Sequence, residues 1–309
     1  MSDAATIARL SEEIIAKGSQ SFAAAARLFD PATRTDAMML YAWCRHCDDV
    51  VDGQELGSGG TLLATDARER LGELERDTRR AFAGEAVAHP AFQALQLVAK
   101  RHAMPEALAL DHLEGFRMDV EERHYESVED LLDYCHHVAG VVGVMMARIM
   151  GARDAATLQR AADLGLAFQL TNIARDIVPD ARVGRIYLPA QWLREIGLDL
   201  SRITEEAERE KVARLARRLV DLAEPYYASA HIGIEALPRR SAWAIATALG
   251  VYRRIGVEVV RRGSHAWDKR VSTGKAAKLG EVAKGGLIAL MPRARSRAPR
   301  SAELWAHSA

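Results

Sequence analysis

Residues 164–180 read LGLAFQLTNIARDIVPD and carry a helical pattern of apolar and polar positions. The polar positions are spaced by three, four and four, so they project from one side of one helix. They are Gln169, Asn172, Asp176 and Asp180. Four apolar residues alternate with them (Leu164, Leu166, Leu170 and Ile173), which predicts a mostly buried helix. Buried carboxylates without partners are unfavourable, and only Arg175 is a basic neighbour in sequence.

The same period of about 3.6 residues runs through almost the whole chain, and strand-like alternation is scarce. Pro90 and Pro105 are expected to open helices and Pro179 to close one. We predict an all-α fold, with one domain over residues 1–291 and a basic, disordered tail over 292–309. The expected helices span residues 3–18, 22–29, 32–53, 61–83, 90–102, 105–123, 127–151, 154–178, 189–196, 201–231, 235–263 and 275–290.

The composition excludes several classes of protein. The 309 residues include 42 basic and 42 acidic side chains, whereas a dedicated nucleic-acid binder usually has a basic excess. Three cysteines are too few for a disulfide framework and favour a reducing compartment. The first residues include several charges and so lack a signal-peptide core, and the longest apolar stretch, 138–147, is too short to span a bilayer. We therefore expect a cytoplasmic protein.

Two motifs are not expected to bind metal. Cys44 and Cys47 form a Cys-x-x-Cys pattern, but a structural zinc site needs a second pair of ligands, and Cys135 stands alone. His136 and His137 are adjacent, so on a helix they point about 100° apart and cannot share one metal ion. We expect both histidines to be core or surface residues.

A second acidic array precedes the first along the chain. Asp48 and Asp52 lie one turn apart on one helix face, with Arg45 three residues earlier. The two carboxylates repel each other, and a divalent cation reverses that interaction because Mg²⁺ prefers oxygen ligands. Mg²⁺ usually takes one or two protein carboxylates and shares its other sites with substrate phosphates, so the two arrays together predict a diphosphate substrate. A solvated acidic patch is the alternative.

Small residues interrupt the apolar segment 134–147. Ala139, Gly140 and Gly143 are tolerated in a helix where something must approach it closely. Two interpretations remain equally open: close packing of another helix, or the wall of a long apolar cavity.

Together these segments resemble the squalene/phytoene synthase family of head-to-head prenyl transferases. The resemblance spans about residues 18–280, and no motif residue departs from it. It implies an isoprenoid-synthase helical bundle around a central apolar cavity. The matching pieces are residues 19–22 (SQSF), 41–45 (YAWCR), 48–52 (DDVVD), 134–149, 164–180, 184–189 (GRIYLP), Tyr252 and 269–271 (KRV).

The resemblance also implies site residues. Tyr134 would face the reacting carbons, where an aromatic ring stabilises a cation, and would act with Asp48, Asp52 and Asp176 as the catalytic set. The ligands of Mg²⁺ or Mn²⁺ would be Asp48, Asp52, Asn172, Asp176 and Asp180. The diphosphates would be held by Ser21, Tyr41, Arg45, Gln169, Arg185, Tyr252 and Arg270. The walls that exclude water would include Phe22, Ala26, Val138, Gly143, Leu164 and Gly165.

The implied activity is the condensation of two prenyl diphosphates through a cyclopropyl diphosphate. Within the family the sequence is most similar to bacterial enzymes that form phytoene, the first step of carotenoid biosynthesis. We therefore expect geranylgeranyl diphosphate as substrate, 15-cis-phytoene as product and no use of NADPH. We also expect peripheral membrane contact, contact with a downstream carotenoid enzyme, and no nucleic-acid partner. The alternatives are a C15-using squalene or dehydrosqualene synthase, and a non-catalytic scaffold of the same fold.

Ala26 is the residue that we expect to set the length of the prenyl tail. It lies one turn beyond Phe22, and a C20 tail exceeds a C15 tail by one isoprene unit, roughly one helical turn. An equally open alternative is that residues 23–26, four alanines, simply form a closely packed helix.

Overall fold

Helix α9 (Ala155–Arg182) contains the whole of residues 164–180. The computed structural model describes residues 4–18, 25–52, 54–55, 58–59, 64–291 and 299–307. Asp154 caps α9 by accepting a hydrogen bond from the N–H of Thr157 at 2.9 Å. The expectation that Pro179 closes this helix is wrong, because a proline near the end of a helix removes only one hydrogen bond. Asp180 therefore stays on the same helix as Asp176.

The remaining described elements confirm the all-α prediction. Two strands of two residues each, β1 (Gln54–Glu55) and β2 (Ser58–Gly59), pair antiparallel. The longer helices are α1 (Ala4–Gly18), α3 (Pro31–Asp52), α4 (Ala64–Phe82), α5 (Pro90–His102), α6 (Glu106–Val120), α7 (Val128–Cys135), α8 (Val141–Ile149), α10 (Ala190–Ile196), α11 (Arg209–Gly233), α12 (Arg239–Arg262) and α13 (Lys275–Leu290). Short 3₁₀ turns are η2 (Leu200–Arg202), η3 (Glu206–Glu208), η4 (Ile234–Ala236) and η5 (Gly263–His265). Of the helix expected at 22–29, residues 25–29 are described: Ala25 and Ala26 are helical, and residues 27–29 form a turn.

Residues 127–151 form three elements where the sequence predicts one helix. A π-helical turn, η1 (His136–Gly140), separates α7 from α8. A Cβ atom on Gly165 would overlap the carbonyl oxygen of Ala139, and one on Gly143 would overlap that of Ala161. The backbones of η1 and α8 thus touch that of α9 directly, so the small residues serve close helix packing.

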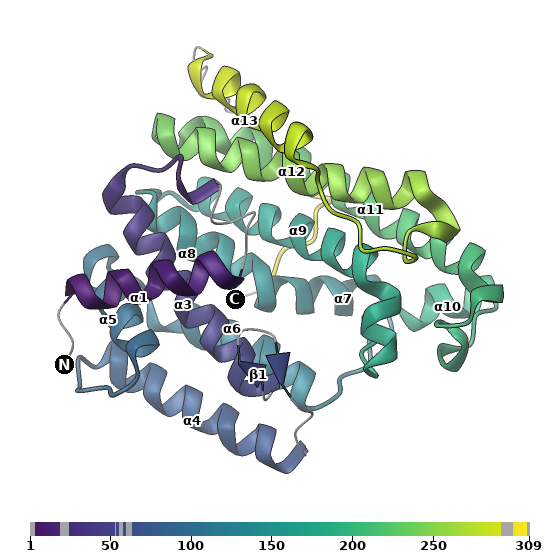
Figure 1. Cartoon of the computed structure of the whole chain (residues 1–309), viewed down its shortest axis with the longest axis horizontal. Coiled ribbons are helices and arrows are strands. Elements are labelled where there is room, and N and C mark those ends of the chain that lie inside the picture. The colour runs from purple at the N-terminus through teal and green to yellow at the C-terminus, as the bar shows by residue number, and fades with distance from the viewer. Residues whose placement is uncertain are drawn as a thin grey trace.

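Helix α9 runs through the middle of the molecule (Figure 1). It packs against α11, α8 and α12, and α13 lies on the outer side of α12. Its buried side chains include Leu166, Leu170 and Ala174, each at most 2% exposed. The opposite side of the molecule is built from α3 to α6, so α3 and α9 can present their acidic faces to the space between the two halves.

Residues 299–307, within the region that the composition predicts to be a disordered tail, are among the described residues. Residues 299–307 lie against the helical body, where Arg300 forms an ion pair with Asp163 of α9 at 2.8 Å. Asp163 is only 2% exposed, and a buried carboxylate of this kind requires a cationic partner. Leu304 and Trp305 add apolar contacts with the core. A domain boundary at residue 291 stays a prediction.

Candidate active site

A cavity of about 910 Å³ lies between α3 and α9, near the upper end of the size range usual for ligand pockets. Every described residue that the sequence nominates lines it: Ala26, Tyr41, Arg45, Asp48, Tyr134, Val138, Gly143, Leu164, Gly165, Gln169, Asn172, Asp176, Asp180, Arg185, Tyr252 and Arg270. Ser21, Phe22 and the side chain of Asp52 lie outside the described residues. The cavity thus joins two acidic arrays that are more than 120 positions apart in sequence.

The acidic side of α9 is held by two arginines. Arg270 donates from Nε and Nη2 to the two oxygens of Asp176 at 3.3 and 3.1 Å, and Arg175 donates to both from Nε at 3.0 Å. Burial raises the pKa of Asp176, but the hydrogen bonds from these arginines outweigh it and leave the pKa below its usual value. Burial and the neighbouring charge of Asp176 raise the pKa of Asp180 to about 7.

Asn172 and Asp180 show that this side of the cavity suits a divalent cation. The Oδ1 atom of Asn172 is buried and has no hydrogen-bond partner among the described residues. Such an orphaned oxygen is unfavourable unless a ligand takes it. Repulsion between two neighbouring carboxylates is likewise relieved by a cation, and the donors here are all oxygens, which Mg²⁺ and Mn²⁺ prefer. The residues present therefore fit such an ion.

The facing helix α3 supplies Arg45 and Asp48 to the cavity. Nη1 of Arg45 donates to Oδ2 of Asp48 at 2.8 Å, and its other Nη donates to Asp49. Tyr41 lies one turn earlier, and burial raises the pKa of its hydroxyl to about 12, so it stays a neutral donor at physiological pH. The α3 side of the cavity thus combines one carboxylate with two groups that can donate to a phosphate.

Tyr134 belongs to a cluster of aromatic and acidic side chains. Its hydroxyl donates to Oδ2 of Asp119 at 3.2 Å, and the hydroxyl of Tyr187 donates to Oδ1 at 3.1 Å. The two rings are stacked, with centroids 4.8 Å apart and planes 18° apart. Burial raises the pKa of Tyr134, so the ring stays a neutral phenol. A carboxylate thereby fixes two aromatic rings at the cavity wall.

Beyond these groups the cavity is mostly apolar, with His112, Thr157 and Arg160 as its further polar lining residues. Its walls there include Phe29, Met146, Ile234 and Ile245. On the polar side, Phe168 stacks on Tyr252 with ring centroids 4.2 Å apart. The arrangement can hold a charged group at one part of the cavity while a hydrocarbon fills the rest.

Comparison with known proteins identifies the family of this chain. The squalene/phytoene synthase family matches residues 15–277, which include the cavity residues of α3, α9 and α12. The chain belongs to this family. Squalene/phytoene synthases are prenyl transferases that generally depend on a divalent metal ion, and this chain is an enzyme of that type.

Two relatives are similar to this chain over nearly its whole length. A 15-cis-phytoene synthase of Pantoea ananas is 56% identical over 294 residues, which cover 95% of each chain. A 15-cis-phytoene synthase of Enterobacter agglomerans is 55% identical over 289 residues, or 93% of this chain and 98% of its own.

Solved structures of family members share the fold. A dehydrosqualene synthase superposes with a TM-score of 0.80 at 27% identity, covering 91% of this chain and 95% of its own. The squalene synthase of Alicyclobacillus acidocaldarius superposes with a TM-score of 0.73 at 28% identity. The superposition covers 84% of this chain and 94% of that synthase.

Three residues of the site were not predicted from the sequence. Asp119 and Tyr187 join the Tyr134 cluster, and Phe168 stacks on Tyr252. Tyr187 lies within the motif at 184–189, so that motif could have identified it as a site residue. No second acidic residue lies three or four positions before Asp119 on α6, so no helical spacing marks it in the sequence. Only the fold brings it to the cavity.

Proposed function

We propose that this chain is a phytoene synthase that joins two geranylgeranyl diphosphates head to head. The first substrate loses its diphosphate, the double bond of the second attacks the cation, and loss of a proton leaves a cyclopropyl diphosphate. Loss of the second diphosphate, rearrangement and a second proton loss give 15-cis-phytoene. The electrons balance without a hydride donor, so we expect no requirement for NADPH.

One observation carries this proposal: a single cavity combines acidic arrays on two facing helices with cationic groups and a long apolar extension. A scaffold without activity gains nothing from carboxylates that repel each other, such as those that raise the pKa of Asp180. The two relatives at 55–56% identity, both named 15-cis-phytoene synthase, support the phytoene-forming reaction.

We assign the diphosphate end to the polar part of the cavity. When bound, Mg²⁺ or Mn²⁺ would supply positive charge against the leaving diphosphate. Arg270 is already paired with Asp176 and would turn to the phosphate as the carboxylate engages the cation. The full set of proposed metal ligands is Asp48, Asp52, Asn172, Asp176 and Asp180. The proposed diphosphate ligands are Ser21, Tyr41, Arg45, Gln169, Arg185, Tyr252 and Arg270.

The carbocation would form beside Tyr134. The face of an aromatic ring attracts a cation, and Asp119 holds this ring and that of Tyr187 in place. The carboxylate adds a negative charge close to the wall where the cation forms. Val138 and Leu164 line the neighbouring surface and would keep water from the cation, which would otherwise be trapped as an alcohol.

The length of the cavity supports C20 substrates. Both Asp176 and Arg160 of α9 line it, and 16 residues of helix span about 24 Å, or a little over four turns. One isoprene unit corresponds to about one turn, so four units fit between them. The cavity therefore accommodates a C20 chain, and the solved relatives with the same fold include squalene and dehydrosqualene synthases.

The direct experiment is product identification. Purified protein would be incubated with C15 or C20 diphosphate and Mg²⁺ or Mn²⁺, with and without NADPH. We expect a C40 triene-centred hydrocarbon from the C20 substrate, formed equally without NADPH. Preferential formation of a C30 product from the C15 substrate, or a product that appears only with NADPH, would favour the squalene or dehydrosqualene alternative.

Peripheral membrane contact is the second part of the proposal. No helix of the described residues combines the length and apolar character needed to cross a bilayer. Four large apolar side chains on or just after α13 are nevertheless 65–71% exposed: Leu279, Leu287, Leu290 and Met291. On the helix these apolar side chains form a stripe, with Lys275 on one side of it and Lys284 on the other. Positive charge beside an exposed apolar stripe suits binding to a membrane of anionic lipid. We propose that the cytoplasmic enzyme rests on a membrane through this stripe, beside the downstream enzyme that consumes phytoene.

A further inference from the structure

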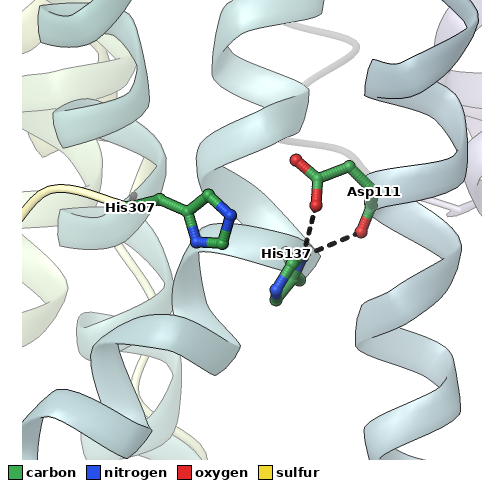
Figure 2. A group of neighbouring side chains, drawn as sticks. All are labelled: Asp111, His137 and His307. Atoms are coloured by element: carbon green, nitrogen blue, oxygen red, sulfur yellow. Dashed lines mark hydrogen bonds and ion pairs between the residues drawn. The ribbon is translucent and has the colours of Figure 1, made fainter. Parts of the chain in front are cut away.

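A second group of side chains with metal-binding atoms lies outside the cavity. Asp111 comes from α6, His137 from η1 and His307 from the C-terminal segment 299–307. One ligand atom from each lies within 4.8 Å of the others, and Figure 2 shows the three side chains converging. None of the three lines the large cavity. The group therefore needs an explanation separate from prenyl transfer.

Carboxylates lie on both sides of the His137 ring, and one of them also faces His307. Nδ1 of His137 lies 2.7 Å from Oδ1 of Asp111 and 3.0 Å from its carbonyl oxygen. The other nitrogen of His137, Nε2, faces Oδ1 of Asp133 at 3.7 Å, and the same oxygen lies 3.4 Å from Nδ1 of His307. Asp133 thus lies behind both rings, where it can accept their second N–H groups. Metal-binding histidines nearly always donate their other ring nitrogen to such an acceptor.

Two further contacts hold this geometry. His136 stacks on His307 with ring centroids 4.5 Å and planes 7° apart, which fixes the orientation of the terminal ring. Arg123 donates to Asp133 at 3.2 Å, which holds that carboxylate in place. Adjacent His136 and His137 do not need to share an ion, because the second imidazole comes from the end of the chain.

We propose that Asp111, His137 and His307 bind a zinc ion that fastens the C-terminal segment to α6 and η1. The ligands would be Nδ1 of His137, Nε2 of His307 and a carboxylate oxygen of Asp111, with water as the fourth. Nδ1 of His137 donates to Asp111 in this structure, so zinc binding would release that proton to solvent. Two imidazoles and one carboxylate are a donor set that suits Zn²⁺, whereas Mg²⁺ prefers oxygen alone. The ion would add to the Arg300–Asp163 pair, which ties down the same segment. This site does not depend on the proposed function.

The test uses the full chain, stripped of metal and supplied with excess Mg²⁺ so that the cavity carboxylates are occupied. Zinc alone is titrated by calorimetry, and Co²⁺ replaces it for visible absorption. We expect one zinc equivalent that disappears in His307→Ala and His137→Ala. Asp133→Asn should keep the site with an affinity lower by roughly 10–100-fold. His265→Ala is the matched control, because it removes an exposed histidine that is also paired with an aspartate, at 2.9 Å.

Folding and zinc binding are measured separately. His137 is 8% exposed, so its replacement can disturb packing, whereas His307 lies in the terminal segment and is the decisive variant. Circular dichroism checks that both variants are folded. The proposal is supported if the cobalt bands and the zinc equivalent vanish in folded His307→Ala and persist in His265→Ala. It is overturned if wild type and His307→Ala bind zinc alike, or if neither binds it.

Discussion

Removal of the Arg300 side chain should destabilise the protein through a single buried carboxylate. Arg300 makes three contacts of 2.8–3.1 Å with Asp163, which is 2% exposed, and donates to the carbonyls of Leu304 and Trp305. In Arg300→Ala the only remaining donor to Asp163 among the described residues is the hydroxyl of Ser229. Leaving one member of a buried ion pair typically costs 3–5 kcal/mol, and we expect about 3 because water can reach Asp163 once the segment detaches.

The assay is thermal unfolding with calorimetric detection. For a chain of this length, unfolding as one unit, about 3 kcal/mol lowers the midpoint by about 5 °C. Asp163→Asn should cost less than Arg300→Ala, because Arg300 is 12% exposed, keeps its hydrogen bonds to the carbonyls of Leu304 and Trp305, and can still donate to the amide oxygen. The double variant should be no less stable than Arg300→Ala alone.

The matched control is Arg261→Ala. Arg261 is 69% exposed and pairs with Glu258 on the surface, so its loss should change stability by no more than about 1 kcal/mol. If Arg300→Ala unfolds within 1 °C of wild type by this measure, or if the two buried substitutions add fully, the ion pair does not hold the segment as argued.

The remaining predictions concern packing, chain length and the membrane. Gly143→Ala should destabilise the protein by roughly 1–3 kcal/mol in urea unfolding, because its new methyl group would overlap a carbonyl oxygen of α9; unchanged stability would refute the contact. Ala26→Phe, at a 4% exposed position on the cavity wall, should reduce turnover of C20 diphosphate and spare C15; equal loss on both would show that Ala26 does not gauge tail length. Replacing Leu287 and Leu290 by Gln should abolish flotation with anionic vesicles while activity on detergent-dispersed substrate persists, and unaltered flotation would exclude the α13 stripe.

Local patterns predict the central helix and its acidic face well. The spacing of Gln169, Asn172, Asp176 and Asp180 depends only on the period of the helix, so it survives the error at Pro179. The small residues near Gly143 illustrate a different outcome. Close packing and a cavity wall are both correct, since Gly143 touches the backbone of α9 and also lines the cavity.

Contacts between distant segments could not be predicted from one sequence. Arg270 is 94 positions from Asp176, and Arg300 is 137 positions from Asp163. The charges of these arginines are visible in the sequence, but their partners depend on how whole helices pack. For the same reason the composition of the tail gives no sign of the contacts that Arg300 and Trp305 make with the helical body.

The central claim is that the carboxylates of α3 and α9 act together on a diphosphate through divalent cations. The most direct measurement is the release of diphosphate from C20 substrate by wild type and Asp176→Asn as Mg²⁺ is titrated. Asp268→Asn, which alters an exposed aspartate, is the control. We predict that wild type and the control depend fully on Mg²⁺ and lose activity reversibly in EDTA, while folded Asp176→Asn releases diphosphate at least ~100-fold more slowly, the scale expected when one group that stabilises the developing charge is lost. Undiminished release by Asp176→Asn, or full activity without a divalent metal, would contradict the account.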